Sequence, residues 1–330
     1  MKAYAITRGS LMLLLAALLF IPLNSPTPAA AQVALTVRFG VDSFILGSPV
    51  YIADELRIFQ KVGIRPVIQP FSFGIDTIDG VLAGRTDVGF ALDFPLLLRL
   101  QTGQLRVIAA VIEPEPGFHK LAVRRGIGGA ADMRGKRLGI AQGTLQHFVT
   151  IRYLQVGGVN PAEVQLVPLP SLFEIVAALR RGSIDAAWVW GPGTDEAQQI
   201  EGVRILTDDS AAQHRSYGYM VVGAQYLAGK REAVVATLKA LVEATDWLNK
   251  NLPAAARIIS KRNNAPEDRV LTELRKQNST VSLQRKHINA LSELLGFMLE
   301  NNMLRTRISV PDFFVTRPLQ EAAPDRVQIR

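Results

Sequence analysis

Short apolar segments alternate with segments of helical spacing along the first two thirds of the chain. In the first part, the apolar runs that predict strands cover residues 35–41, 66–71, 88–92 and 107–112. The helices predicted between them begin at capping residues, such as Ser48 before Pro49, and end at glycines, such as Gly63. Such alternation is typical of parallel-rich sheets covered by helices on both faces.

The same alternation restarts after a break rich in proline. Residues 113–117 contain two prolines and one glycine, which predicts a linker. Beyond this break, the apolar runs that predict strands cover residues 120–124, 136–141, 164–169, 186–190 and 203–206. The polar residues 208–215 predict a second linker, and a further strand is expected at 219–222.

The last third of the chain is predicted to be nearly all helical. Helical spacing covers residues 230–250, 253–263, 266–278 and 283–303. The polar residues 320–330 are expected to form a loose tail.

Two linkers that bracket a middle block imply a chain that crosses twice between two lobes. We predict an α/β fold in which each lobe is a mostly parallel sheet flanked by helices and the two crossings form a hinge. Residues 116–213 would form one lobe, and residues 32–115 and 214–319 the other. The cleft between two such lobes is the expected ligand site.

One turn occurs in both expected lobes. Residues 84–87 (Gly-Arg-Thr-Asp) and 182–185 (Gly-Ser-Ile-Asp) each follow an apolar helix and precede an apolar strand. Glycine suits the left-handed end of a helix, and the aspartate can accept backbone N–H groups in the turn. We expect the two strands to lead to opposite walls of one cleft. A common turn without functional meaning is the alternative.

The first 31 residues are predicted to be a signal peptide. Lys2 and Arg8 form a basic start, residues 11–23 are apolar, and small residues precede the expected cleavage site near Ala31. A run of 13 apolar residues is shorter than the ~20 that a spanning helix needs. We expect a soluble periplasmic protein; an uncleaved anchor is the alternative.

Composition excludes several functions. The chain has no cysteine, so disulfides, thiolate metal sites and cysteine nucleophiles are absent. The four histidines share no metal-ligand spacing, and no hydrolase or zinc-protease motif occurs. The glycines at 126–129 lack the long helix of a nucleotide site, and no basic stripe with aromatics suggests nucleic acid. We therefore expect no catalytic residue, metal or cofactor. The formal charge of +8 is compatible with a small anionic ligand or with a solvated basic surface.

The candidate ligand residues lie in loops at the expected carboxyl ends of strands, where open α/β sheets bind ligands. Gly143 and Thr144 open a helix whose free N–H groups favour an anion, with His147 one turn further on. Trp188 and Trp190 lie at the end of one expected strand, and which of them faces the cleft is open. The other candidates in these loops and beside the linkers are Ser43, Phe44, Leu46, Asp93, Phe94, Gln142, Phe118, with its neighbour His119, and Tyr217. An ordinary capped turn is the alternative for each loop, and Asp93 in particular suits an N-cap.

Several weak motifs together resemble a known family in their order and spacing. They are the segments 50–53 with Phe59 and Gly63, 84–88, 132–138, 143–147, 157–159 with 163–164, and 178–186. The chain thereby resembles the solute-binding proteins of ABC importers for nitrate, taurine and alkanesulfonates, a group similar to pyrimidine-precursor binding proteins. The related pyrimidine synthases use a cysteine-rich iron motif, which this chain cannot carry.

The resemblance implies a two-lobed fold of the type II periplasmic binding protein kind that closes on a small ligand. It also implies delivery to an ABC permease with its ATPase, and we expect a monomer that binds no nucleic acid. The first hypothesis is capture of a small organic anion such as a sulfonate, taurine or nitrate. A heteroaromatic thiamine-precursor pyrimidine or an aromatic acid is the second. An exported enzyme with His147 as its base is the third.

Overall fold

The computed structural model describes residues 35–42, 46–114, 117–301, 303–304 and 306–329. These described residues belong to one compact unit. The expected signal peptide with its cleavage site near Ala31, and the candidate ligand residues Ser43 and Phe44, lie outside the described residues.

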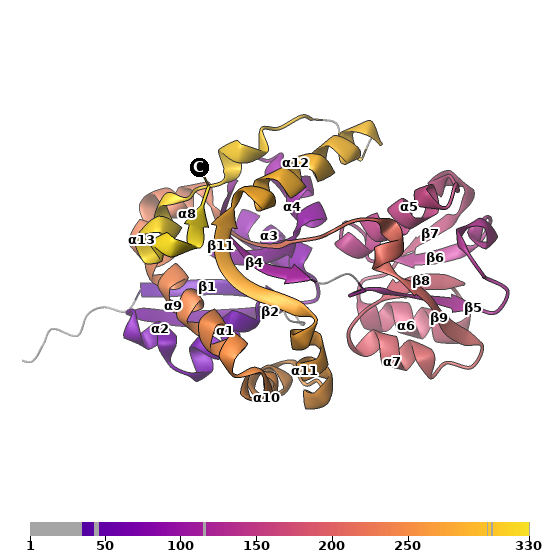
Figure 1. Cartoon of the computed structure of the whole chain (residues 1–330), viewed down its shortest axis with the longest axis horizontal. Helices are drawn as coiled ribbons and strands as arrows, with labels where there is room; N and C mark the ends of the chain where they lie inside the picture. The colour runs from indigo at the N-terminus through magenta and orange to yellow at the C-terminus, as the bar shows by residue number, and fades with distance from the viewer. Residues whose placement is uncertain (1–34, 43–45, 115–116, 302, 305, 330) are drawn as a thin grey trace, which may run out of the picture. The chain divides into compact units, whose positions relative to one another are not determined.

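The described strands form two sheets (Figure 1). The order in the seven-stranded sheet is β12 (Val327–Gln328), β11 (Gln277–Gln284), β4 (Leu105–Pro114), β10 (Gly218–Gly223), β3 (Val88–Leu92), β1 (Leu35–Asp42) and β2 (Ile64–Phe71). The order in the five-stranded sheet is β7 (Gln165–Pro168), β6 (Arg137–Ile140), β8 (Ala186–Val189), β5 (Lys120–Arg124) and β9 (Val203–Asp208). The chain passes from the first sheet to the second after β4 and returns after β9.

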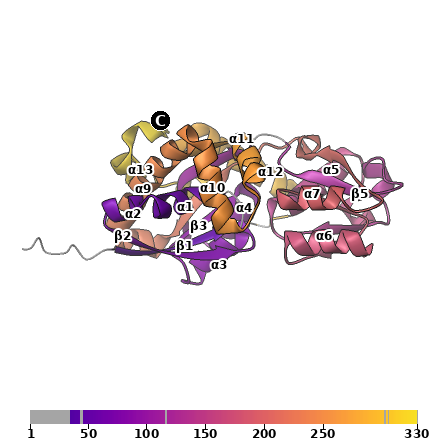
Figure 2. The ribbon, with the colours of Figure 1, turned by 90° about the horizontal axis from the view of Figure 1, so that it is seen from below.

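Alternating side chains on the strands build a core on each face of the seven-stranded sheet. On β10, Met220 and Val222 belong to one core cluster, whereas Tyr219 and Val221 belong to another. The helices of the first cluster include α1 (Ser48–Glu55), α9 (Arg231–Lys250) and α10 (Leu252–Asn263). Those of the second include α3 (Gly74–Leu82), α4 (Asp93–Leu100) and α12 (Arg285–Glu300). Figure 2 shows α1 and α9 on one side of β1 and α3 on the other.

The remaining helices complete both layers. The five-stranded sheet packs against α5 (Leu145–Val156), α6 (Leu172–Arg181) and α7 (Pro192–Gln198). The other helices are α2 (Ile58–Lys61), α8 (Ala224–Gly229), α11 (Glu267–Arg275) and α13 (Arg317–Ala322), with a 3-10 turn, η3 (Asp209–Ala212), at the second crossing. Within the part of the chain that the structure describes, no helix is long and apolar enough to cross a membrane.

The predicted α/β class is confirmed, but the sheets are mixed rather than mostly parallel. In the five-stranded sheet, β6 pairs in parallel with β7 and β8, whereas β5 pairs antiparallel with β8 and β9. In the seven-stranded sheet, β10 runs antiparallel to both β3 and β4. The double crossing explains this mixture. A parallel pair needs a long crossover connection, usually a helix, whereas a strand that enters or leaves its sheet through a hinge segment has none.

Two predicted elements are wrong in detail. The single helix predicted up to Gly63 is broken at Arg57, which has φ 54°, into α1 and α2. The residues between two predicted helices form strand β11 instead, where Val281 and Leu283 enter the core. Within the segment expected to be a loose tail, Arg326 donates to both carboxylate oxygens of Asp246 at 2.8 Å.

The repeated Gly-x-x-Asp turn has the same geometry in both sheets. Asp87 accepts from the backbone N–H of Arg38 at 2.8 Å and from its guanidinium at 2.6 and 3.1 Å. Asp185 accepts from Arg137 in the same way, at 2.9 Å and at 2.8 and 3.1 Å. Gly84 and Gly182 have φ 68° and 71°. The aspartate thus joins its turn to the neighbouring strand, rather than bonding within the turn as expected.

The two aspartates offer a matched test of this turn. The Asp87 side chain is 8% exposed and that of Asp185 is 21% exposed. Because hydrogen bonds to charged groups gain strength with burial, we expect Asp87→Ala to lower the free energy of unfolding by about 2–3 kcal/mol. We expect a smaller loss for Asp185→Ala. Urea unfolding of both variants measures the difference, and an equal or larger loss for Asp185→Ala would contradict it.

A buried charge cluster supports the first crossing from the end of β4. Glu113 contacts the fully buried His287 at 3.3 Å and Lys286 at 2.6 Å. The hydrogen bond from His287, helped by Lys286 and opposed by burial, lowers the pKa of Glu113 from 4.5 to about 2. The cluster therefore ties β4 to the start of α12 through an ionised carboxylate.

This cluster predicts an acid-dependent part of the stability. Since the folded protein lowers the pKa of Glu113, its contribution is complete above about pH 4.5 and is lost as the pH falls towards 2. The loss is expected to be about 3 kcal/mol. Denaturant unfolding of the wild type and Glu113→Gln between these pH values measures it. Glu113→Gln should show a flatter dependence; parallel curves would refute the assignment.

Candidate functional site

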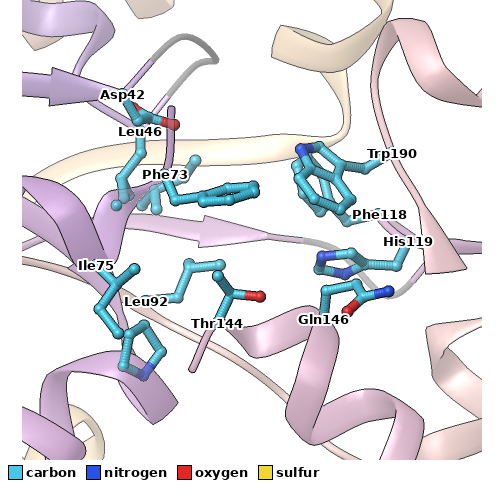
Figure 3. Close-up of a pocket in the computed structure, with 13 residues that line it drawn as sticks. Asp42, Leu46, Phe73, Ile75, Leu92, Phe118, His119, Thr144, Gln146 and Trp190 are labelled. Atoms are coloured by element: carbon cyan, nitrogen blue, oxygen red, sulfur yellow. The ribbon is translucent and has the colours of Figure 1, made fainter. Parts of the chain in front are cut away.

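An inter-sheet cavity of about 80 Å³ lies where strands of both sheets end (Figure 3). Segments that belong to the seven-stranded sheet and its helices supply Asp42, Leu46, Phe73, Gly74, Ile75, Leu92, Pro95 and Ile112. The hinge and the five-stranded side supply Phe118, His119, Thr144, Gln146 and Trp190. Pockets for drug-sized ligands have roughly 300–1,000 Å³. The inter-sheet cavity therefore suits a small solute.

Two helices begin at this cavity. Gly74 and Ile75 form the first turn of α3, and Thr144 is the N-cap of α5. The first N–H groups of a helix have no acceptor within it, and the helix dipole adds a partial positive charge there. The Thr144 hydroxyl donates to the carbonyl of Ala141 at 2.7 Å, so it does not accept from the N–H groups of its own helix. Both helix starts therefore favour a negatively charged group.

Aromatic rings cover one side of the cavity. Trp190 is 6.2 Å from Phe73 and 5.4 Å from His119, measured between ring centroids. Phe118 makes an edge contact with His119 at 4.9 Å. Figure 3 shows these four rings around the space that Thr144 faces from the opposite side. Such a wall can bury the apolar part of a ligand.

His119 is held in place by the second crossing of the chain. Its Nδ1 lies 3.0 Å from Oδ2 of Asp209, which also accepts from the backbone N–H of His119 at 2.9 Å. The other carboxylate oxygen accepts from the backbone N–H of Gly117 at 2.5 Å. Burial raises the pKa of Asp209, but the hydrogen bonds from His119 and Gly117 outweigh burial and leave it lowered. An ionised Asp209 therefore joins the two crossings beside the cavity.

The candidate ligand residues divide into three groups. Those that line the inter-sheet cavity are Leu46, Phe118, Thr144 and Trp190. Those that line a neighbouring cavity are Phe94, Gln142, Gly143 and His147. Those that are buried elsewhere are Asp93, Trp188 and Tyr217. The structure thus places Trp190, and not Trp188, at the inter-sheet cavity.

The buried group has partners of its own. Asp93 accepts from Ser216 at 2.9 Å and contacts His214 at 2.9 Å. Trp188 is 1% exposed and makes an edge contact with Tyr153. Tyr217 packs on His287 at 5.3 Å. These contacts explain the burial of the three residues without a ligand.

Gly143 and His147 bond to each other. The backbone N–H of Gly143 donates to Nδ1 of His147 at 3.3 Å, and burial lowers the pKa of His147. A neutral histidine that accepts this N–H takes it away from any anion. Gly143 and His147 therefore satisfy each other, whereas the N–H groups that follow Thr144 lie at the start of α5.

Several lining residues were not among the candidates. They are Asp42, Phe73, Gly74, Ile75, Leu92, Pro95, Ile112 and Gln146. The turn at 73–75 follows β2 at its carboxyl end, so the rule that selected the other loops would have found it. The helix expected from residue 76 begins two residues earlier, at Gly74. His119 was noted only for its place beside the linker. Among the described residues, no group of histidine and carboxylate side chains could hold a metal ion.

Known proteins share this fold and part of this sequence. The taurine-binding periplasmic protein of Escherichia coli (strain K12) is 27% identical over 197 residues, which cover 59% of this chain and 58% of that protein. The solved alkanesulfonate-binding protein SsuA from Xanthomonas axonopodis pv. citri, bound to MOPS, has a TM-score of 0.73 and 19% identity over 85% of this chain and 98% of the other. The desulfurization enzyme DSZB has a TM-score of 0.67 and 17% identity over 88% of this chain and 99% of its own.

These similarities confirm the periplasmic binding protein fold. They also include an enzyme, so the fold alone does not decide between binding and catalysis. The NMT1-like family model matches residues 31–262, which span most of both sheets. The chain belongs to the NMT1-like family.

Proposed function

We propose that this protein is the periplasmic substrate-binding component of an ABC importer and captures a small sulfonate. The observation that carries the proposal is the convergence of two helix N-termini, at Gly74 and Thr144, on one cavity. Relatives named as taurine-binding and alkanesulfonate-binding proteins support the same ligand class. The capture would be followed by delivery to a membrane permease.

The lining favours an organic anion over nitrate. Leu46, Ile75, Leu92, Ile112 and the aromatic wall offer apolar surface that a bare inorganic anion would leave unfilled. An alkanesulfonate can place its oxygens at the helix starts and its carbon chain against this surface. The proposed ligand residues are those that line the cavity, with Thr144 and Trp190 foremost.

The aromatic rings around the cavity support a second candidate ligand. A heteroaromatic pyrimidine or an aromatic acid could stack beside Phe73 and Trp190, which are 6.2 Å apart. The contacts around His147 speak against catalysis, because its Nδ1 already accepts from Gly143 and no nucleophile lines its cavity among the described residues. Signal-peptide cleavage near Ala31, periplasmic location and a monomeric state belong to the same proposal.

A thermal-shift panel tests the proposal on the mature protein. It should contain butanesulfonate, taurine, nitrate, a pyrimidine and an aromatic acid, in a buffer without a sulfonate group, since SsuA is described as bound to MOPS. A true ligand at 100 times its Kd should add about 2.7 kcal/mol of stability. We expect the largest shift with a sulfonate. A shift with the pyrimidine alone would move the assignment to the second candidate, and turnover of a bound compound would show an enzyme.

A further inference from the structure

The proposed anion site in the inter-sheet cavity has no permanently charged basic side chain in its described lining. Among the described lining residues there is no lysine or arginine, and Asp42, which is 5% exposed, contributes a carboxyl group. The ionised Asp209 lies directly behind His119. Helix N-termini provide partial charges only, typically worth ~0.3–2 kcal/mol. A lining side chain with a full positive charge would add to this attraction.

His119 is the titratable group at the right place. It lines the cavity, and Figure 3 shows its ring between Trp190 and Gln146, with the edge away from its own backbone turned towards Thr144. Nδ1 is engaged by Asp209 at 3.0 Å. Among the hydrogen bonds between described residues, none involves Nε2 of His119.

The partner of Nδ1 decides what Nε2 can do. An ionised carboxylate only accepts hydrogen bonds, so Nδ1 must carry a proton. A neutral imidazole then presents a lone pair at Nε2, which repels an anion. Only the imidazolium presents an N–H at this position. An oxygen of a bound anion can therefore bond to His119 only when the ring has gained a proton.

We propose that anion capture in this cavity is coupled to proton uptake by His119, with Asp209 holding the Nδ1 proton and Nε2 donating to the anion. The step is a binding equilibrium in which one proton passes from the solvent to Nε2. This inference rests on the proposed function, because it concerns the same site.

The other charged groups near His119 leave this assignment intact. Asp209 faces the ring from η3, and Asp42 lines the same cavity from the end of β1. Next to His119 in the chain, Lys120 is paired with Asp208 at 3.1 Å. The ring thus contacts the carboxylate of Asp209, and the adjacent lysine has a carboxylate partner of its own.

Calorimetry with butanesulfonate tests the coupling. The binding enthalpy is measured in two sulfonate-free buffers of different ionisation enthalpy, at several pH values from about 5 to 9, the range in which histidines titrate. The difference between the buffers gives the protons taken up per bound ligand. We expect uptake that rises to a clear maximum within this range. Binding without uptake at every pH would overturn the inference and leave the proposed function standing.

Two variants test whether His119 is the residue that takes up the proton. His119→Gln keeps a side-chain N–H donor, so we expect it to bind within about tenfold of the wild-type affinity but without the uptake. His147→Gln is the matched control, because His147 lies in the neighbouring cavity and is bonded to Gly143. It should keep the uptake. Equal uptake in His119→Gln and the wild type would overturn the inference, whereas a failure of every sulfonate to bind the wild type would overturn the proposed function as well.

Discussion

Thr144→Asp is expected to lower the affinity for butanesulfonate by at least ~100-fold while the protein stays folded. Thr144 is 9% exposed, lines the cavity and is the N-cap of α5. Two like charges about 4 Å apart repel each other by about 4 kcal/mol at an effective dielectric constant of about 20. Solvent in an open cleft reduces this value, which is why we expect about two orders of magnitude at the least.

The folded state should tolerate the same change. Aspartate is as good an N-cap as threonine, and a negative charge at this end of α5 is favoured by the helix dipole. The lost hydrogen bond from the Thr144 hydroxyl to the Ala141 carbonyl lowers the free energy of unfolding by about 1 kcal/mol and offsets this gain. The free energy of unfolding should therefore change by less than about 1 kcal/mol.

Thr144→Asn is the control for this prediction. Asparagine matches aspartate in shape and in capping preference but carries no charge. Isothermal titration should show affinity within about tenfold of the wild type for Thr144→Asn and the large loss only for Thr144→Asp. Equal effects of the two variants would mean that shape, and not charge, matters here. If neither variant changed the affinity by much, the neutral heteroaromatic ligand would be favoured.

The alternation of apolar and polar positions was sufficient to predict the class of fold. It placed β1, β3, β5 and most neighbouring helices within a few residues, because these strands are rich in apolar residues. It failed at β11, where Gln277, Ser279 and Ser282 interrupt the apolar pattern. That strand exists because β4 offers a partner and Val281 reaches the core. Long-range pairing of this kind leaves no local signal.

The candidate site was predictable in outline but not in detail. The rule that ligands bind at the carboxyl ends of strands selected Leu46, Thr144 and Trp190, which line the inter-sheet cavity. It could not tell that Asp93 is engaged by His214 and Ser216, or that Gly143 donates to His147. These bonds depend on residues brought together by the fold, and motif spacing alone does not reveal them.

Trp188→Ala is expected to lower the free energy of unfolding by about 3–5 kcal/mol, the cost of emptying a large core position. Trp188 is 1% exposed, packs on Tyr153 and lies opposite Leu121 in the neighbouring strand. The cavity left behind is walled by β5 and α5, so its collapse would disturb the five-stranded sheet. Urea unfolding should show the loss.

Trp190→Ala is the matched partner, since Trp190 lies just beyond the end of β8 (Ala186–Val189), the strand that holds Trp188. Trp190 borders the inter-sheet cavity beside Phe73 and His119. Its removal enlarges a space that already exists, so its cost in stability should be smaller than that of Trp188→Ala. Its cost in affinity should be larger, about tenfold or more, because it removes apolar contact with the ligand. Trp188→Ala should therefore cause the larger loss of stability in urea unfolding, and Trp190→Ala the larger loss of affinity in titration with butanesulfonate. The same order in both measurements would contradict the assignment of Trp190 to the ligand and Trp188 to the core.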